Sequence, residues 1–218
     1  MKNLILQLIL LASTLIFFKA LEKTLISWNF SWTISKVFPY LVLIILGFTL
    51  SRKIKKFFFI KIPFLRFFLL LIIFFAPFGI GFMMNPIYEG DFSKNGTSIP
   101  NEQSLSDFKG FDLVVITIPN CPFCHESVNT INLMQKRNPK LKIKYVVCAK
   151  ESREIEPYKI KLDNKIQVTL AQNLDKMVSV SKGSFPCFVK INKTDVYTWS
   201  NDNFGVRAKD LLESEIKE

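Results

Sequence analysis

Apolar and polar positions divide the 218-residue chain into two parts near residue 84. Three long apolar runs come before that point, and short apolar runs alternate with polar ones after it. A helix needs about 20 apolar residues to cross a bilayer core. We therefore expect a membrane region over 1–84, a polar tether over 85–103 that contains Gly90, Gly96 and Pro100, and a folded domain over 104–218.

The three apolar runs are the candidate membrane spans. Residues 64–84 are long enough alone, whereas residues 4–18 and 37–50 reach the length of a span only if each extends by several residues. The first run could instead be a cleaved signal peptide with Lys2 as its basic end, although no small-x-small cleavage site follows it. The pattern predicts about three transmembrane helices.

Basic residues are concentrated in the apolar part. Residues 1–84 contain ten Lys or Arg and one acidic residue, whereas residues 85–218 contain nineteen and seventeen. A nucleic-acid-binding domain should itself be basic, so we expect no nucleic-acid partner. Basic loops between apolar helices instead indicate contact with membrane lipid.

Loop charge also predicts the orientation of the chain. The loop between the second and third runs carries five basic residues: Arg52, Lys53, Lys55, Lys56 and Lys61. The loop before it carries three basic residues and one acidic residue. Because the more basic loop faces the cytoplasm, we expect everything after about residue 85 to be extracytoplasmic.

Strand and helix patterns alternate in the second part of the chain. Residues 112–118 are almost continuously apolar, as in a strand buried on both faces. Residues 122–137 predict a helix and residues 141–147 a second strand, which together make a right-handed unit with parallel strands. Four later segments complete the pattern: a short strand at 166–170, a short helix at 174–180, a hairpin at 188–199 and a last helix at 204–216.

A Cys-x-x-Cys motif lies where the first of these strands gives way to the helix. Cys121 falls at the N-cap and Pro122 at the first helical position, where the missing N–H of proline costs nothing. The free N–H groups and the positive end of the helix dipole favour the Cys121 thiolate. The spacing predicts a dithiol redox site in which Cys121 attacks and Cys124, one turn further on, resolves the mixed disulfide.

The order of these elements resembles the thioredoxin fold over about residues 104–218. The resemblance rests on Cys121 and Cys124 after the first long strand and on Phe185-Pro186 before the hairpin. It implies an α/β fold with a central mixed sheet flanked by helices. It also implies that Pro186 is cis and lies against Cys121, while the backbone of Phe185 pairs with a substrate strand.

The whole chain is also similar to thioredoxin-like domains that follow DoxX/MauE-type membrane regions in some bacteria. Those regions usually have four helices. This resemblance implies a thiol–disulfide oxidoreductase of the bacterial inner membrane, multi-pass and without a cofactor. Two positions depart from thioredoxins: Val115 stands where they have a buried Asp, and Asn120 where they have a Trp.

The cysteines also indicate the partners. All four lie after residue 84, so the apolar part has no thiol with which to pass electrons. We therefore expect a separate membrane electron donor or acceptor, with a protein or small-molecule disulfide or dithiol as substrate. The direction of transfer stays open, since potentials in this fold span about 150 mV.

His125, the only histidine, leaves other interpretations open. When protonated it could favour the Cys121 thiolate, or it could face solvent without a role. Cys-x-x-Cys-His is also the c-type haem attachment pattern, with Met134 or Met177 as a second axial ligand, but alternating strands and helices are unlike a small cytochrome. The same residues could carry Cu(I). A structural zinc site would need a fourth ligand.

Cys148 and Cys187 should end and begin the strands on either side of the active-site strand. Strands two places apart are separated by about 9–10 Å, and a disulfide allows about 7 Å between Cα atoms. We therefore expect two free thiols. Cys148 is expected to be a packed residue, and Cys187 either a packed residue or an auxiliary thiol near Cys121.

Overall fold

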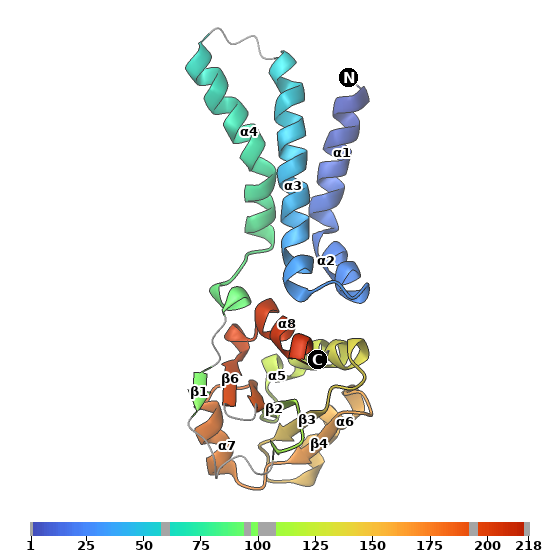
Figure 1. Ribbon diagram of the computed structural model, residues 1–218, viewed down its shortest axis with the longest axis vertical. Helices are drawn as coiled ribbons and strands as arrows, with labels where there is room; N and C mark the ends of the chain where they lie inside the picture. The colour runs from blue at the N-terminus through green and yellow to red at the C-terminus, as the bar shows by residue number, and fades with distance from the viewer. Residues whose placement is uncertain (1, 58–61, 94–96, 100–107, 192–195, 216–218) are drawn as a thin grey trace. The chain divides into compact units, whose positions relative to one another are not determined.

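A computed structural model describes residues 2–57, 62–93, 97–99, 108–191 and 196–215. The chain forms two compact units, Met1–Tyr88 and Glu89–Glu218 (Figure 1). Lys61, Gly96, Pro100 and the turn of the expected hairpin at 192–195 lie outside the described residues.

The first unit is helical. Its elements are α1 (Lys2–Ile16), α2 (Phe18–Ser27), α3 (Trp32–Ile54), the short 3₁₀ helix η1 (Lys55–Phe57) and α4 (Pro63–Met84). Helices α3 and α4 are each long and apolar enough to cross a membrane. The presence of these helices supports the interpretation that this is a membrane protein, as the apolar pattern predicted.

The expected first span is bent. α1 and α2 meet at Phe17 at an angle of 68°, so the described residues contain two candidate spans, or three if the bent pair counts as one. The 15 residues of α1 rise only about 22 Å, less than the about 30 Å of a bilayer core. Lys19 and Glu22 of α2 end the apolar run itself, soon after the bend.

Helices α3 and α4 pack closely because small residues line their contact. A β-carbon at Gly47 of α3 would overlap the carbonyl oxygen of Phe74 in α4. In membranes, small residues at such positions let helix backbones approach. Gln7 of α1 is buried and donates to the carbonyl of Leu46 at 3.0 Å and to Thr49 Oγ1 at 2.5 Å, which joins α1 to α3.

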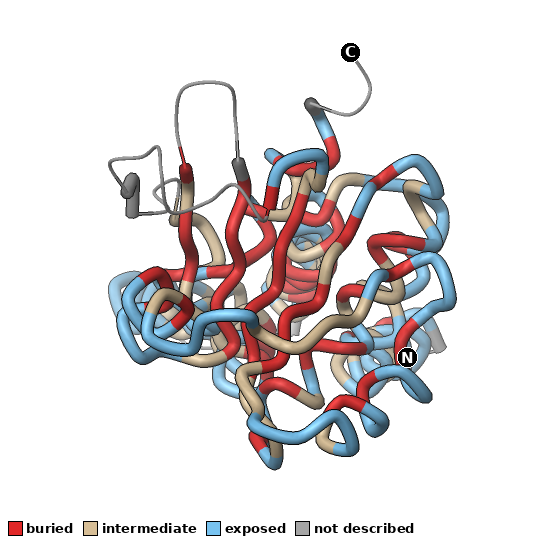
Figure 2. The backbone as a smooth tube through the Cα atoms, turned by 90° about the horizontal axis from the view of Figure 1, so that it is seen from below, coloured by how far each residue is buried: buried red, intermediate tan, exposed pale blue. Residues whose placement is uncertain are grey.

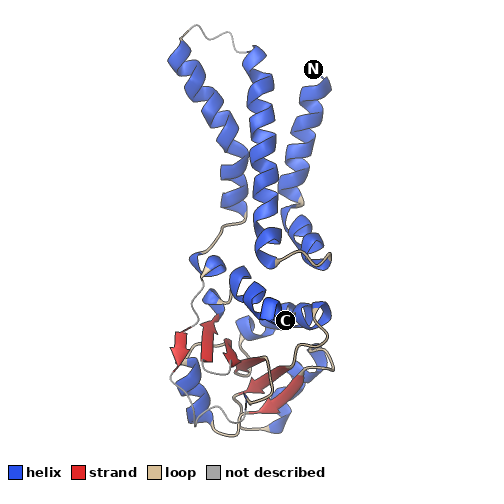
Figure 3. Ribbon diagram, in the orientation of Figure 1, coloured by secondary structure: helices blue, strands red, loops and turns tan. Residues whose placement is uncertain are grey.

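The second unit is α/β. Its strands are β1 (Thr97–Ile99), β2 (Leu113–Thr117), β3 (Ile143–Val147), β4 (Gln167–Leu170), β5 (Cys187–Ile191) and β6 (Val196–Ser200). They form one sheet in the order β1-β6-β5-β2-β3-β4, and Figure 3 draws its strands in red. β2, β3 and β4 are parallel, whereas β5 and β6 run antiparallel to their neighbours. The predicted α/β class and mixed sheet are confirmed.

The helices of this unit are α5 (Pro122–Arg137), α6 (Glu156–Lys161), α7 (Leu174–Ser181) and α8 (Val206–Glu215). One face of the sheet packs on α7. There Ile116 and Val189 form a hydrophobic cluster with Met177 and Val180, called the α7-side cluster. Buried residues, red in Figure 2, follow the strands. Because strand side chains alternate between faces, the neighbours of these residues point to the opposite side.

That opposite face carries α5, α6 and α8. The Tyr145 hydroxyl of β3 lies 2.8 Å from Ser127 Oγ of α5, and its ring centroid is 5.3 Å from that of Tyr158 in α6. Phe188 of β5 stacks on Phe204, two residues before α8, with ring centroids 3.8 Å apart. The helix that follows the Cys-x-x-Cys motif is thus held directly on the central strands.

Part of the expected tether belongs to the second unit. The 3₁₀ helix η2 (Glu89–Phe92) packs against residues just before α8, and β1 pairs with β6. A β-carbon at Gly90 would overlap the carbonyl oxygen of Asp202, so the two backbones touch there. The polar composition of this stretch did not predict η2 or β1, because backbone pairing needs no apolar pattern.

Candidate functional site

The turn between β2 and α5 places the two cysteines. Asn120 adopts a left-handed conformation with φ of 55°, which asparagine tolerates better than most residues. Cys121 follows in extended geometry as the N-cap of α5, and Pro122 opens the helix. The predicted N-cap position of Cys121 is therefore confirmed.

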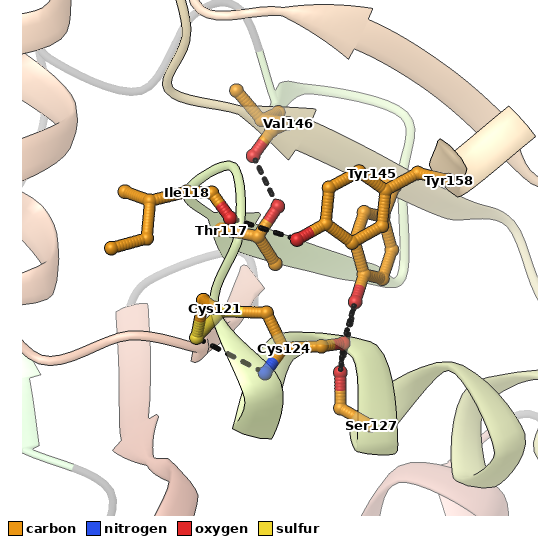
Figure 4. The surroundings of a disulfide bond; sticks show 8 residues. All are labelled: Thr117, Ile118, Cys121, Cys124, Ser127, Tyr145, Val146 and Tyr158. Atoms are coloured by element: carbon orange, nitrogen blue, oxygen red, sulfur yellow. Dashed lines mark hydrogen bonds between the residues drawn. A yellow bond between two sulfur atoms is a disulfide. The ribbon is translucent and has the colours of Figure 1, made fainter. Parts of the chain in front are cut away.

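Cys121 and Cys124 are joined by a disulfide, with their Cα atoms 5.2 Å apart (Figure 4). Cys121 retains 8% of its surface exposed, whereas Cys124 is fully buried. Between them in sequence, Phe123 is 57% exposed. Of the two sulfurs, a partner in solution can approach that of Cys121 with less rearrangement.

Backbone donors of α5 meet Cys121. Its Sγ accepts the N–H of Cys124 at 3.1 Å, and its carbonyl oxygen accepts the N–H of His125 at 3.1 Å. A backbone N–H at a helix start that points at a sulfur stabilises negative charge on it. The Cys124 N–H, which points at the sulfur, is the donor that would stabilise a Cys121 thiolate after reduction.

Two hydroxyl groups meet the carbonyl oxygen of Cys124 (Figure 4). Ser127 Oγ donates to it at 2.8 Å and the Tyr145 hydroxyl at 3.0 Å. Tyr145 is fully buried, and burial raises its pKa well above 10, so it stays a phenol. The sequence predicts a role for neither Ser127 nor Tyr145, because nothing in their spacing shows that β3 lies against the first turn of α5.

A second tyrosine, Tyr158, is hydrogen-bonded to the backbone on the strand side of the motif. The Tyr158 hydroxyl of α6 donates to the carbonyl oxygen of Ile118 at 2.8 Å, three residues before Cys121. Burial raises the pKa of Tyr158, so it too stays protonated. The segment from Ile118 to Cys124 is therefore hydrogen-bonded at both ends by buried phenols.

His125 stacks on Tyr158, with ring centroids 4.7 Å apart and the planes 14° from parallel. Burial, and then the positive charge of Lys161, lower the pKa of His125 below 6.5. The imidazole is thus neutral at pH 7. The lowered pKa disfavours the protonated form that the expected role beside Cys121 requires, and the ring lies against Tyr158 rather than freely in solvent.

Phe185-Pro186 lies at the same edge of the sheet as the disulfide. Ile116 near the end of β2 pairs with Cys187 at the start of β5, so Pro186 falls beside the carboxyl end of β2, from which the Cys121 turn departs. The Phe185–Pro186 peptide bond is cis, and Pro186 is buried. The side chain of Phe185 packs against the α7-side cluster.

Cys148 and Cys187 are free thiols. Both contact the α7-side core cluster, which lies across the sheet from α5. Burial raises the pKa of Cys148 to about 11 and that of Cys187 to about 12. This placement favours packing for Cys187 over an auxiliary role near Cys121.

A metal or haem site would draw on Cys121, Cys124 and His125, with Met134 or Met177 as a further ligand to haem. The described residues contain no group of three or more His, Cys, Asp or Glu side chains that could hold a metal ion. Met177 lies in the α7-side cluster, across the sheet from His125, and Met134 is fully buried on α5. Neither methionine is placed as an axial ligand opposite His125.

Comparisons with protein-family models, with curated proteins and with solved structures gave no match for this chain.

Proposed function

We propose that the second unit is a thioredoxin-like domain and that the protein is a membrane-tethered thiol–disulfide oxidoreductase. The observation that carries the proposal is a disulfide between the N-cap cysteine of α5 and a buried cysteine one turn further on, at the carboxyl end of the buried central strand β2. The strand order β6-β5-β2-β3, the antiparallel β5–β6 pair and the terminal helix α8 agree with that fold.

The proposed reduction transfers two electrons in two exchange steps. The Cys121 thiolate attacks one sulfur of a substrate disulfide; the substrate S–S bond breaks, a mixed disulfide forms and one substrate thiolate leaves. Cys124 then attacks the Cys121 sulfur, which forms the intramolecular disulfide and releases the second substrate thiolate. Both thiolates take protons from solvent. Substrate oxidation is the reverse sequence, and a separate partner restores the starting state of the dithiol.

The helical unit supports a tether with its basic end in the cytoplasm. Lys53 at the end of α3 donates to the Asn3 carbonyl at the start of α1, and Arg66 near the start of α4 donates to the Lys55 carbonyl. The start of α1, the end of α3 and the start of α4 therefore meet at one end of the helical unit, where Lys53 and Arg66 lie. By the positive-inside rule that end is cytoplasmic, and the second unit, which follows the other end of α4, is extracytoplasmic in a bacterial inner membrane.

Trapping of the mixed disulfide tests the proposal. The full chain carrying Cys124→Ser, reduced and then mixed with oxidised glutathione or with a protein substrate that contains a disulfide, should accumulate a mixed disulfide at Cys121, because no second thiol remains to release it. Cys121→Ser is the matched control and should trap nothing, since Cys124 is buried. Intact-protein mass spectrometry reads the adduct. Equal trapping by both variants, or by neither, would contradict the assignment of Cys121 as nucleophile.

A further inference from the structure

Two buried tyrosines from different elements hold the two ends of the Cys-x-x-Cys segment. We propose that Tyr145 and Tyr158 are positioning residues that shift the equilibrium of the Cys121–Cys124 pair toward the disulfide. This inference rests on the proposed redox function and concerns the dithiol–disulfide equilibrium of the same site.

On the helix side, Tyr145 acts through backbone. Its hydroxyl donates to the Cys124 carbonyl at 3.0 Å and lies 2.8 Å from Ser127 Oγ, which donates to the same carbonyl at 2.8 Å. All three groups are buried, so water does not compete for these hydrogen bonds. The first turn of α5 is thereby fixed to β3.

On the strand side, Tyr158 of α6 fixes the backbone before Cys121. Its hydroxyl donates to the Ile118 carbonyl at 2.8 Å, and its ring stacks on His125. The ring centroids of Tyr145 and Tyr158 are 5.3 Å apart, so the two side chains also support each other. Together they span the segment from before Cys121 to Cys124.

The effect on the redox equilibrium follows from geometry. The disulfide requires the backbone to hold both sulfurs at bonding distance, whereas the dithiol does not. Contacts that hold the backbone in the disulfide geometry remove freedom that the reduced form would otherwise gain, so they raise the effective concentration of one thiol for the other. Removing a hydroxyl should therefore make the disulfide easier to reduce.

This effect differs from ordinary stabilisation. A contact that stabilises the oxidised and reduced forms equally changes the melting temperature but leaves the thiol–disulfide constant unchanged. Only a contact that favours one redox state moves that constant. The equilibrium with glutathione therefore separates positioning from a merely structural role.

The test equilibrates the full chain in detergent micelles with known ratios of reduced and oxidised glutathione. One protein disulfide and two glutathione thiols give a protein dithiol and one glutathione disulfide, and alkylation followed by mass spectrometry counts the protein thiols. For Tyr145→Phe and for Tyr158→Phe we expect the constant for disulfide formation to fall about threefold to tenfold, as for the loss of about one hydrogen bond. A tenfold fall corresponds to about 30 mV.

Tyr197→Phe is the matched control, because Tyr197 pairs with Lys190 toward the turn end of the β5–β6 hairpin, away from the Cys121 turn. Its constant should equal that of the unmodified chain. Unchanged constants in Tyr145→Phe and Tyr158→Phe would overturn the inference, whatever their melting temperatures. If one variant does not fold, Ser127→Ala, which removes the neighbouring donor to the Cys124 carbonyl, decides in its place and should also lower the constant.

The proposed function and this inference fail in different ways. A chain that exchanges with glutathione normally, with the same constant in every tyrosine variant, loses only the inference. A chain whose Cys121–Cys124 pair exchanges with no thiol at all loses the proposed function.

Discussion

Replacing Glu213 with Gln tests what holds α5 against α8. Arg137 in the last turn of α5 forms a two-bond ion pair with Glu213 of α8: Nε to Oε1 at 3.0 Å and Nη2 to Oε2 at 2.8 Å. Each side chain retains only 6% of its surface exposed. Glu213→Gln keeps the shape and one acceptor but removes the negative charge that faces the buried guanidinium in this pair.

Burial sets the magnitude. Breaking a buried ion pair by removing one partner costs about 3–5 kcal/mol, a large share of the about 5–15 kcal/mol by which a domain is stable. An exposed pair gives the matched control: Lys159 and Glu156 of α6 are 2.8 Å apart, with 45% and 54% of their side chains exposed. Glu156→Gln should cost about 1 kcal/mol or less, because solvent screens that pair.

Hydrogen exchange measured by mass spectrometry reads the difference within the second unit. The slowest amides of β2 should exchange more than about 100-fold faster in Glu213→Gln, since each 1.4 kcal/mol is tenfold, and less than about tenfold faster in Glu156→Gln. Trapping of a mixed disulfide by Cys121 should persist in both, because Arg137 lies at the far end of α5 from the N-cap. Equal acceleration in the two variants would show that burial of the pair does not set its energy.

Two further predictions concern titratable groups. At pH 8 the native protein with its disulfide intact should react with iodoacetamide at Cys148 and Cys187 about 100-fold or more slowly than after unfolding, since burial raises both pKa values to about 11 and about 12; reaction at the rate of an unfolded thiol would contradict this. The pKa of His125 is lowered by burial, so the unfolded state takes up a proton first as the pH falls through 6.5. The free energy of unfolding should therefore fall between pH 7.5 and 5.5 by more in the unmodified chain than in His125→Gln, and parallel curves would reject the lowered pKa.

Local patterns in the sequence determined the elements that carry the site. The helix predicted over residues 122–137 has those bounds, because Pro122 opens it, Asn138-Pro139 ends it and apolar positions of period 3.6 lie between. The continuous apolar run at 112–118 yields the buried strand β2. The N-cap position of Cys121 and its pairing with Cys124 follow from spacing within one turn, so no distant residue was needed to predict them.

Tertiary structure alone decided which residues surround the two sulfurs. Tyr145 and Tyr158 stand 21 and 34 residues after Cys124, and no local pattern shows that both point at its helix. Sheet pairing also decided that Cys187 faces α7 rather than the dithiol, since a change of one residue in register reverses the face of every side chain. Spacing along the chain governs hydrogen bonds within a turn, whereas packing of strands and helices far apart in sequence governs what a buried site contacts.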